Sequence, residues 1–249
     1  MEKEPEDWSE KMIRIIRQVT ELPREAEELL REDPDSLNHY LSSELFLEDL
    51  QQKDAILNLN VETFFFILYK QFLRRLEDDE VFRRQFQEHV DEQPGSEWTA
   101  KNTENFFDDP ALIEYLVEML DRFVKTENVY RWPGETEEDY QYIVDMLNAA
   151  VDAGDAETFQ IFCHIGNYSL YLTGVIPDWV NHRQEVKKRP MDLDSYRSYG
   201  KTYFERAAQH EFARREKLQP VLTKLHRGYD LVRTSLNLIL KELTPSFPA

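Results

Sequence analysis

Apolar residues recur at intervals of three and four along nearly the whole chain, and this spacing constrains the fold more than any other feature. Such a period places apolar side chains on one face of an α-helix, whereas a half-buried strand would need strict alternation. Proline and glycine residues separate the periodic segments. The sequence therefore predicts an all-α protein, an irregular multi-helix bundle of about ten helices.

The composition agrees with a folded protein that does not enter a membrane. The chain has 249 residues, of which 41% are hydrophobic, and this is enough to bury a sizeable core. A single cysteine excludes an intramolecular disulfide, and the first ten residues lack the pattern of a secretion signal. The longest apolar run, 64–68, is far shorter than the ~20 residues of a membrane span. We therefore expect a soluble, cytoplasmic protein with no membrane partner.

The helical pattern is interrupted at Pro94-Gly95, and residues 92–108 are the best candidate for a linker. This divides the chain into an acidic N-terminal helical part, 1–91, and a C-terminal helical part, 109–249, with a mildly basic end. The two parts form either two helical subdomains or one continuous domain.

The end of the chain carries a regular apolar stripe. Residues 194–243 are predicted to form two helices that meet near Pro220. The stripe consists of Leu222, Leu225, Tyr229, Val232, Leu236 and Ile239. Because it is shorter than three heptads, we expect it to be buried within the chain and not in an intermolecular coiled coil. The oligomeric state remains open.

Charge is distributed unevenly. The net charge is −19, with −24 in residues 1–160 and +5 in residues 161–249. An acidic surface repels phosphate groups, so we do not expect a nucleic-acid partner. The acidic helices are either an ordinary solvated surface or a mimic of nucleic acid that binds a basic protein partner.

Common catalytic motifs are absent from the sequence. It contains no G-x-x-x-x-G-K, G-x-G-x-x-G, G-x-S-x-G, H-E-x-x-H or E-x-x-H. Cys163 and His164 are adjacent, but neighbours on a helix point about 100° apart and do not form a nucleophilic pair. The six histidines are scattered over separate segments. The sequence thus indicates no catalytic residue, no metal site and no cofactor.

The least generic segment is 164–203, which is rich in tyrosine and glycine. Gly166 and Gly200 lie inside helical patterns, where each costs ~1 kcal/mol relative to alanine, so we expect a close helix crossing. A ligand or partner groove beside this crossing could use Arg183, Arg189 or Arg197 to bind an anion. Its candidate residues are His164, Tyr168, Tyr171, Arg183, Tyr196, Arg197 and Tyr203. The alternative is that the tyrosines form the edge of the core.

Three functions are compatible with these features. The first is a non-catalytic, cytoplasmic helical protein that acts by binding a protein partner. The second is a helical-bundle small-ligand binder or enzyme with a site in residues 164–203. The third is the acidic mimic of nucleic acid. The sequence favours the first, because the usual catalytic motifs are absent.

Overall fold

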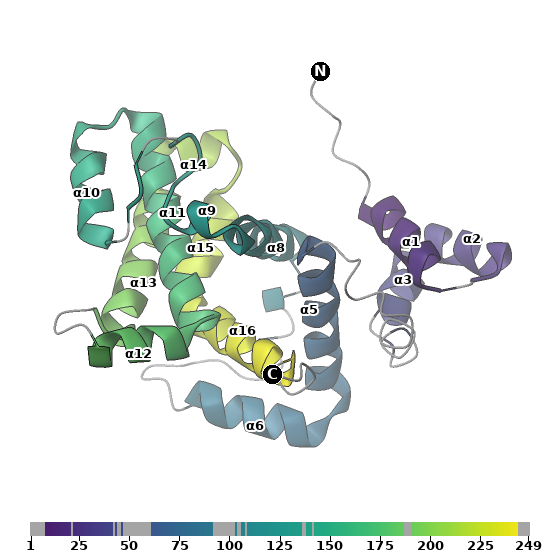
Figure 1. The fold of residues 1–249 in the computed structure, drawn as a ribbon. Helices are drawn as coiled ribbons and strands as arrows, with labels where there is room; N and C mark the ends of the chain where they lie inside the picture. The colour runs from purple at the N-terminus through teal and green to yellow at the C-terminus, as the bar shows by residue number, and fades with distance from the viewer. Residues whose placement is uncertain are drawn as a thin grey trace. The chain divides into compact units, whose positions relative to one another are not determined.

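A computed structural model shows an all-α protein (Figure 1). It describes residues 8–20, 22–41, 43, 46, 61–91, 103, 106–107, 109–135, 138–140, 142–186 and 191–243. Within these residues all regular structure is helical and there is no strand, which confirms the predicted multi-helix bundle. The predicted linker, 92–108, lies almost entirely outside the described residues, and its role remains a prediction. The chain divides into two compact units, 1–83 (unit 1) and 84–249 (unit 2).

Unit 1 is built around short amphipathic helices. They are α1 (Trp8–Val19), α2 (Arg24–Glu32), α3 (Pro34–Leu41), α5 (Val61–Asp78) and the start of α6 (Glu80–Asp91). Their buried side chains include Met12, Ile16, Leu30, Leu37, Leu41, Phe72 and Leu76. The Arg17 guanidinium joins α1 to α2, since its Nε lies 2.8–2.9 Å from both carboxylate oxygens of Glu27.

Unit 2 is organised around one long helix, α11 (Asp155–Gly174) (Figure 1). It contacts α8 (Pro110–Val124), α10 (Ile143–Asp152), α12 (Pro177–Val186), α13 (Leu193–Gln209), α14 (Glu211–Arg215) and α16 (Tyr229–Leu243). The described residues of unit 2 also form the end of α6, α9 (Thr126–Val129) and α15 (Gln219–Arg227). Because neighbours surround α11, most of its residues after Phe159 are buried. This explains why its sequence is apolar on more than one face.

The predicted close helix crossing lies between α11 and α13. A Cβ atom on Gly166 of α11 would lie 2.7 Å from the ring of Phe204 of α13. A Cβ atom on Gly200 of α13 would come even closer to the ring of Tyr229. Both positions therefore need glycine for packing, because each aromatic ring occupies the space that a side chain would take.

The end of the chain differs from the sequence prediction. Residues 193–243 form four helices, α13 to α16, and not two. The first break is at His210, whose Nδ1 accepts a hydrogen bond from the Phe212 backbone at 3.3 Å and caps α14. The second is at Lys217, whose φ of 59° cannot continue a helix. The third is at Gly228, between α15 and α16. The second break agrees with the junction predicted near Pro220, since α15 begins at Gln219. Apolar periodicity did not detect the breaks at His210 and Gly228, because each depends on one residue.

The apolar stripe of residues 222–239 is buried within unit 2. Leu222, Leu225, Tyr229, Val232, Leu236 and Ile239 are all at most 4% exposed. Helix α16 contacts α11, α13 and α15 of the same unit. The expectation that this stripe packs inside the chain is therefore confirmed.

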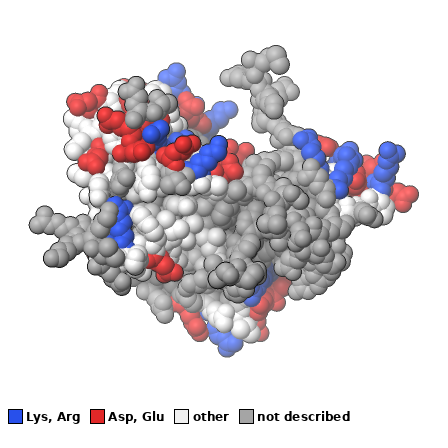
Figure 2. Space-filling view, in the orientation of Figure 1, with Lys and Arg blue, Asp and Glu red and all other residues white. Residues whose placement is uncertain are grey.

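The surface carries charges of both signs. Acidic side chains gather at the end of unit 2 where α10, α11 and α14 lie, and basic side chains are interspersed among them (Figure 2). Among the described helices, none is long and apolar enough to cross a bilayer.

Candidate functional site

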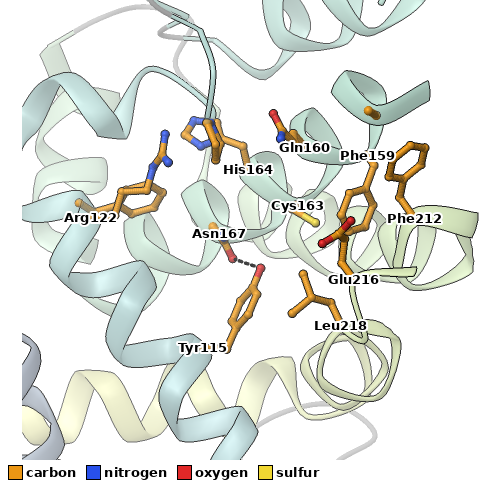
Figure 3. Close-up of a pocket in the computed structure, with 13 residues that line it drawn as sticks. Tyr115, Arg122, Phe159, Gln160, Cys163, His164, Asn167, Phe212, Glu216 and Leu218 are labelled. Carbon is orange, nitrogen blue, oxygen red and sulfur yellow. Dashed lines mark hydrogen bonds between the residues drawn. The ribbon is translucent and has the colours of Figure 1, made fainter. Parts of the chain in front are cut away.

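A cavity of about 480 Å³ lies within unit 2, between α8, α11 and the segment that follows α13 (Figure 3). Thirteen residues line it: Tyr115, Arg122, Phe123, Pro133, Ala156, Phe159, Gln160, Cys163, His164, Asn167, Phe212, Glu216 and Leu218. Its volume falls within the ~300–1,000 Å³ that is typical of small-molecule sites.

Helical spacing explains how the lining residues come together. On α11, Ala156, Phe159, Gln160, Cys163 and Asn167 are separated by three or four positions, so they share one face. Helix α8 supplies Tyr115, Arg122 and Phe123 at spacings of seven and eight, which also repeat on one face. The segment 212–218 closes the far side (Figure 3).

The middle of the cavity wall holds two weakly acidic groups. The Tyr115 hydroxyl donates a hydrogen bond of 3.0 Å to Asn167 Oδ1, and burial raises its pKa well above the usual value. Burial also raises the pKa of the Cys163 thiol to about 12. Since the thiolate is the reactive form, Cys163 is not an activated nucleophile at neutral pH.

His164 is held as a neutral imidazole. Its Nε2 lies 3.1 Å from the carbonyl oxygen of Val129, and a carbonyl only accepts, so Nε2 donates. Burial, together with the positive charge of the neighbouring Arg122, lowers the pKa of His164 to about 3. The imidazole therefore carries no charge near neutral pH, and its pKa is too far from 7 for efficient general acid–base catalysis.

Arg122 brings a positive charge to the same end of the cavity (Figure 3). Its Nη2 donates to the Arg131 carbonyl at 2.8 Å, while its Nε is buried without a partner. Burial lowers the pKa of Arg122, and no described carboxylate acts against that effect. A guanidinium nevertheless stays charged near neutral pH. This end of the cavity therefore has an incompletely satisfied cation.

Four other predicted site residues lie near His164 but do not line the cavity. Tyr168 stacks on the His164 ring with centroids 6.3 Å apart, and Tyr196 lies 6.1 Å from Tyr168. The positive charge of Arg183 acts on the Tyr168 hydroxyl and opposes the rise of its pKa that burial causes. Tyr171 is joined to His164 through Phe123, whose ring is 5.2 Å from that of Tyr171. Tyr168 and Tyr196 are buried, so they contribute to the core here.

The remaining predicted residues lie elsewhere in unit 2. Arg197 donates to Asp230 through Nη2 at 2.8 Å, and Lys201 approaches the same carboxylate at 2.5 Å. The anion for Arg197 is thus provided by the chain itself. Tyr203 stacks with Tyr199 at 6.1 Å. Arg189, the third possible anion-binding arginine, lies outside the described residues.

Sequence reasoning missed most of the cavity. Of the predicted residues, only His164 lines it. The strongest overlooked signal was Phe212, a large aromatic residue in the polar stretch 209–216. Arg122 gave no signal, because an arginine in the last turn of an amphipathic helix is ordinary.

No protein-family model, curated protein or solved structure matches this chain. Its function must therefore be argued from its own geometry. In the part of the chain that the structure describes, no group of three or more His, Cys, Asp or Glu side chains could hold a metal ion. The cavity of unit 2 is therefore the candidate functional site.

Proposed function

We propose that this protein is a non-catalytic binding protein that takes a small organic molecule into the cavity of unit 2. The observation that carries the proposal is a partly open cavity of about 480 Å³ with aromatic walls and a few polar atoms. Phe123, Phe159 and Phe212 offer apolar surface, while Asn167 and Arg122 offer polar groups. Such a combination is typical of small-molecule sites.

The protonation states on the cavity wall favour binding over catalysis. General acids, bases and nucleophiles work best when their pKa values lie near the ambient pH. The pKa of Cys163 is raised to about 12 and that of His164 is lowered to about 3, so both groups are neutral near pH 7. Neither is prepared to transfer a proton or to attack a substrate.

A cavity-filling substitution tests the proposal. Cys163→Phe places a ring inside the cavity, whereas Val151→Phe places the same ring on the surface, because Val151 is 80% exposed. We expect the neutral apolar dye Nile red to bind saturably to the wild type and to Val151→Phe, and to lose binding in Cys163→Phe. Fluorescence titration measures this, and circular dichroism checks that both variants fold. Equal binding by Cys163→Phe would contradict the proposal.

A protein partner remains the second candidate, and one surface feature favours it. Trp179 and Tyr142 are 39% and 45% exposed. The Arg183 guanidinium lies 5.0 Å from the Trp179 ring centre and 5.3 Å from that of Tyr142. Tryptophan, tyrosine and arginine dominate the binding energy of protein interfaces. This aromatic–arginine patch of Tyr142, Trp179 and Arg183 is therefore a candidate contact surface.

A comparison of cytoplasmic extracts tests this second candidate. A true partner should bind the wild type and should bind Trp179→Ala much more weakly, as quantified by mass spectrometry. If the acidic helices instead mimic nucleic acid, binding should weaken as salt rises, because screening acts beyond ~10 Å at 0.1 M. A partner whose binding changes neither with salt nor with Trp179→Ala would contradict both the aromatic–arginine contact surface and the mimicry of nucleic acid.

We also propose a cytoplasmic location and no nucleic-acid partner. Both proposals rest on composition, namely one cysteine and a net charge of −19. Localisation of a fluorescent fusion tests the first, and a gel-shift assay with duplex DNA and RNA at low salt tests the second.

A further inference from the structure

The guanidinium of Arg122 has unused hydrogen-bonding capacity in a partly dehydrated position. The side chain is half-buried, its Nη2 is occupied by the Arg131 carbonyl at 2.8 Å, and its Nε is buried without a partner. A buried donor without an acceptor destabilises a fold, and the effect is larger for a charged group. The Nε atom itself is closed to the cavity, but Arg122 is half-buried and lines the cavity, so an acceptor on a ligand would meet the outer edge of the guanidinium.

We propose that the cavity recognises the carboxylate of a small acid and that Arg122 is its anchor. This inference rests on the proposed function, since it names the class of molecule that the cavity binds. A guanidinium presents its donors in a planar fork that matches the two oxygens of a carboxylate. The outer edge of the Arg122 guanidinium, formed by Nη1 and Nη2, is the side that a ligand in the cavity would meet.

The charges around the cavity select one negative charge on the ligand. Arg122 is the single cation among the described residues that line it, and His164 is neutral. One guanidinium balances a carboxylate but leaves the second charge of a phosphate dianion unpaired in a partly buried site. The opposite end holds Glu216, which would repel a second carboxylate (Figure 3). A monocarboxylate therefore fits better than a phosphate or a dicarboxylate.

The walls between these two ends favour a ligand whose remaining part is apolar. Phe123, which follows Arg122 in α8, also lines the cavity. Phe159, Phe212 and Leu218 line the far part (Figure 3). An aromatic or aliphatic chain would contact these rings while its acid group reaches Arg122. The chemical class is thus a small aryl-alkanoic or medium-chain alkanoic acid.

Matched acid and amide probes test the proposal on the intact protein. We would measure the binding of 3-phenylpropionate, hexanoate and indole-3-acetate, each beside its neutral primary amide, by ligand-observed NMR at pH 7. At least one acid should bind about 10- to 100-fold more tightly than its amide, as expected for a charged hydrogen bond. The preference should vanish in Arg122→Gln and be reduced in Arg122→Lys, which keeps the charge but loses the fork.

The control is Arg206→Gln, which changes the net charge equally at an exposed residue of α13 that does not line the cavity. It should keep the full preference for the acid. Equal binding of acids and amides to the wild type would overturn the proposal. A preference that survives in Arg122→Gln would also overturn it, as would failure of every acid while Nile red still occupies the cavity. If Cys163→Phe binds Nile red as well as the wild type does, the proposed function is contradicted as well.

Discussion

Burial has opposite effects on the pKa values of the acidic and basic side chains of the cavity wall. It raises the pKa of the Cys163 thiol to about 12 and lowers that of the His164 imidazole to about 3. Both shifts have one cause, since a low dielectric disfavours whichever form is charged. Arg122 is the exception, because its intrinsic pKa is too high for burial to neutralise it. Apart from Glu216 at the end opposite Arg122, the cavity therefore combines these neutral groups with one cation.

The shifted pKa of His164 predicts a stability that decreases in mild acid. An unfolded histidine gains a proton near pH 6.5, whereas His164 in the fold resists protonation down to about pH 3. Its contribution is therefore complete above pH 6.5 and is lost as pH falls from about 6.5 towards 3. The free energy of unfolding should decrease by up to about 1.4 kcal/mol per pH unit in this range. Urea titrations at pH 7, 6 and 5 measure this slope.

Two glutamine variants separate His164 from other titrating groups. His164→Gln keeps a donor for the Val129 carbonyl but does not titrate, so its slope between pH 7 and 5 should be smaller than that of the wild type. His182 is exposed, so His182→Gln should keep the wild-type slope. An unchanged slope in His164→Gln would show that the imidazole does not control the acid response.

At the scale of elements, close packing at two glycines and a helix junction near Pro220 were foreseen from sequence, whereas the helix breaks at His210 and Gly228 were not. A glycine inside a good helical pattern is locally unfavourable, and this cost indicated close packing at Gly166 and Gly200. The breaks at His210 and Gly228 left the apolar period almost intact. Periodicity reports which face is buried, and α14 to α16 continue to bury their apolar faces after each change of direction.

The crossing predicts that Gly166→Ala destabilises the protein by about 1–3 kcal/mol, the usual cost of overpacking a core. The new methyl group would lie 2.7 Å from the Phe204 ring, so the ring or the helices must move. Gly154→Ala is the matched control, because no atom lies within 4 Å of its added methyl group. Its effect should stay below about 1 kcal/mol, the cost of replacing the glycine N-cap of α11 by the poorer cap alanine. Urea unfolding compares them, and equal stability of the two variants would contradict tight packing at Gly166.

At the scale of the whole molecule, excess negative charge opposes compaction. The net charge is −19, and residues 1–160 alone carry −24. Ion pairs such as Lys224–Asp109, at 2.5 Å, offset only part of this charge. A chain with a large net charge is destabilised by self-repulsion that mobile ions can screen.

We therefore expect the melting temperature to rise by several degrees between 10 mM and 300 mM NaCl. Differential scanning calorimetry at pH 7.5 measures this shift. Chloride salts are preferred because sulfate strengthens apolar burial by a separate route. A melting temperature that falls with salt would indicate that the ion pairs outweigh the general repulsion.

The sequence by itself determined the helical class, the burial of the stripe at residues 222–239 and the need for glycine at a close crossing. These properties follow from local spacing and from the cost of single residues. The tertiary structure decided the site. Tyr115, Phe159 and Phe212 meet only because three separate segments pack together. The tertiary structure also decided which charged side chains form ion pairs. Arg197 pairs with Asp230 of another helix, whereas no described carboxylate pairs with Arg122. Burial and ion pairing depend on three-dimensional neighbours, which spacing along the chain does not specify.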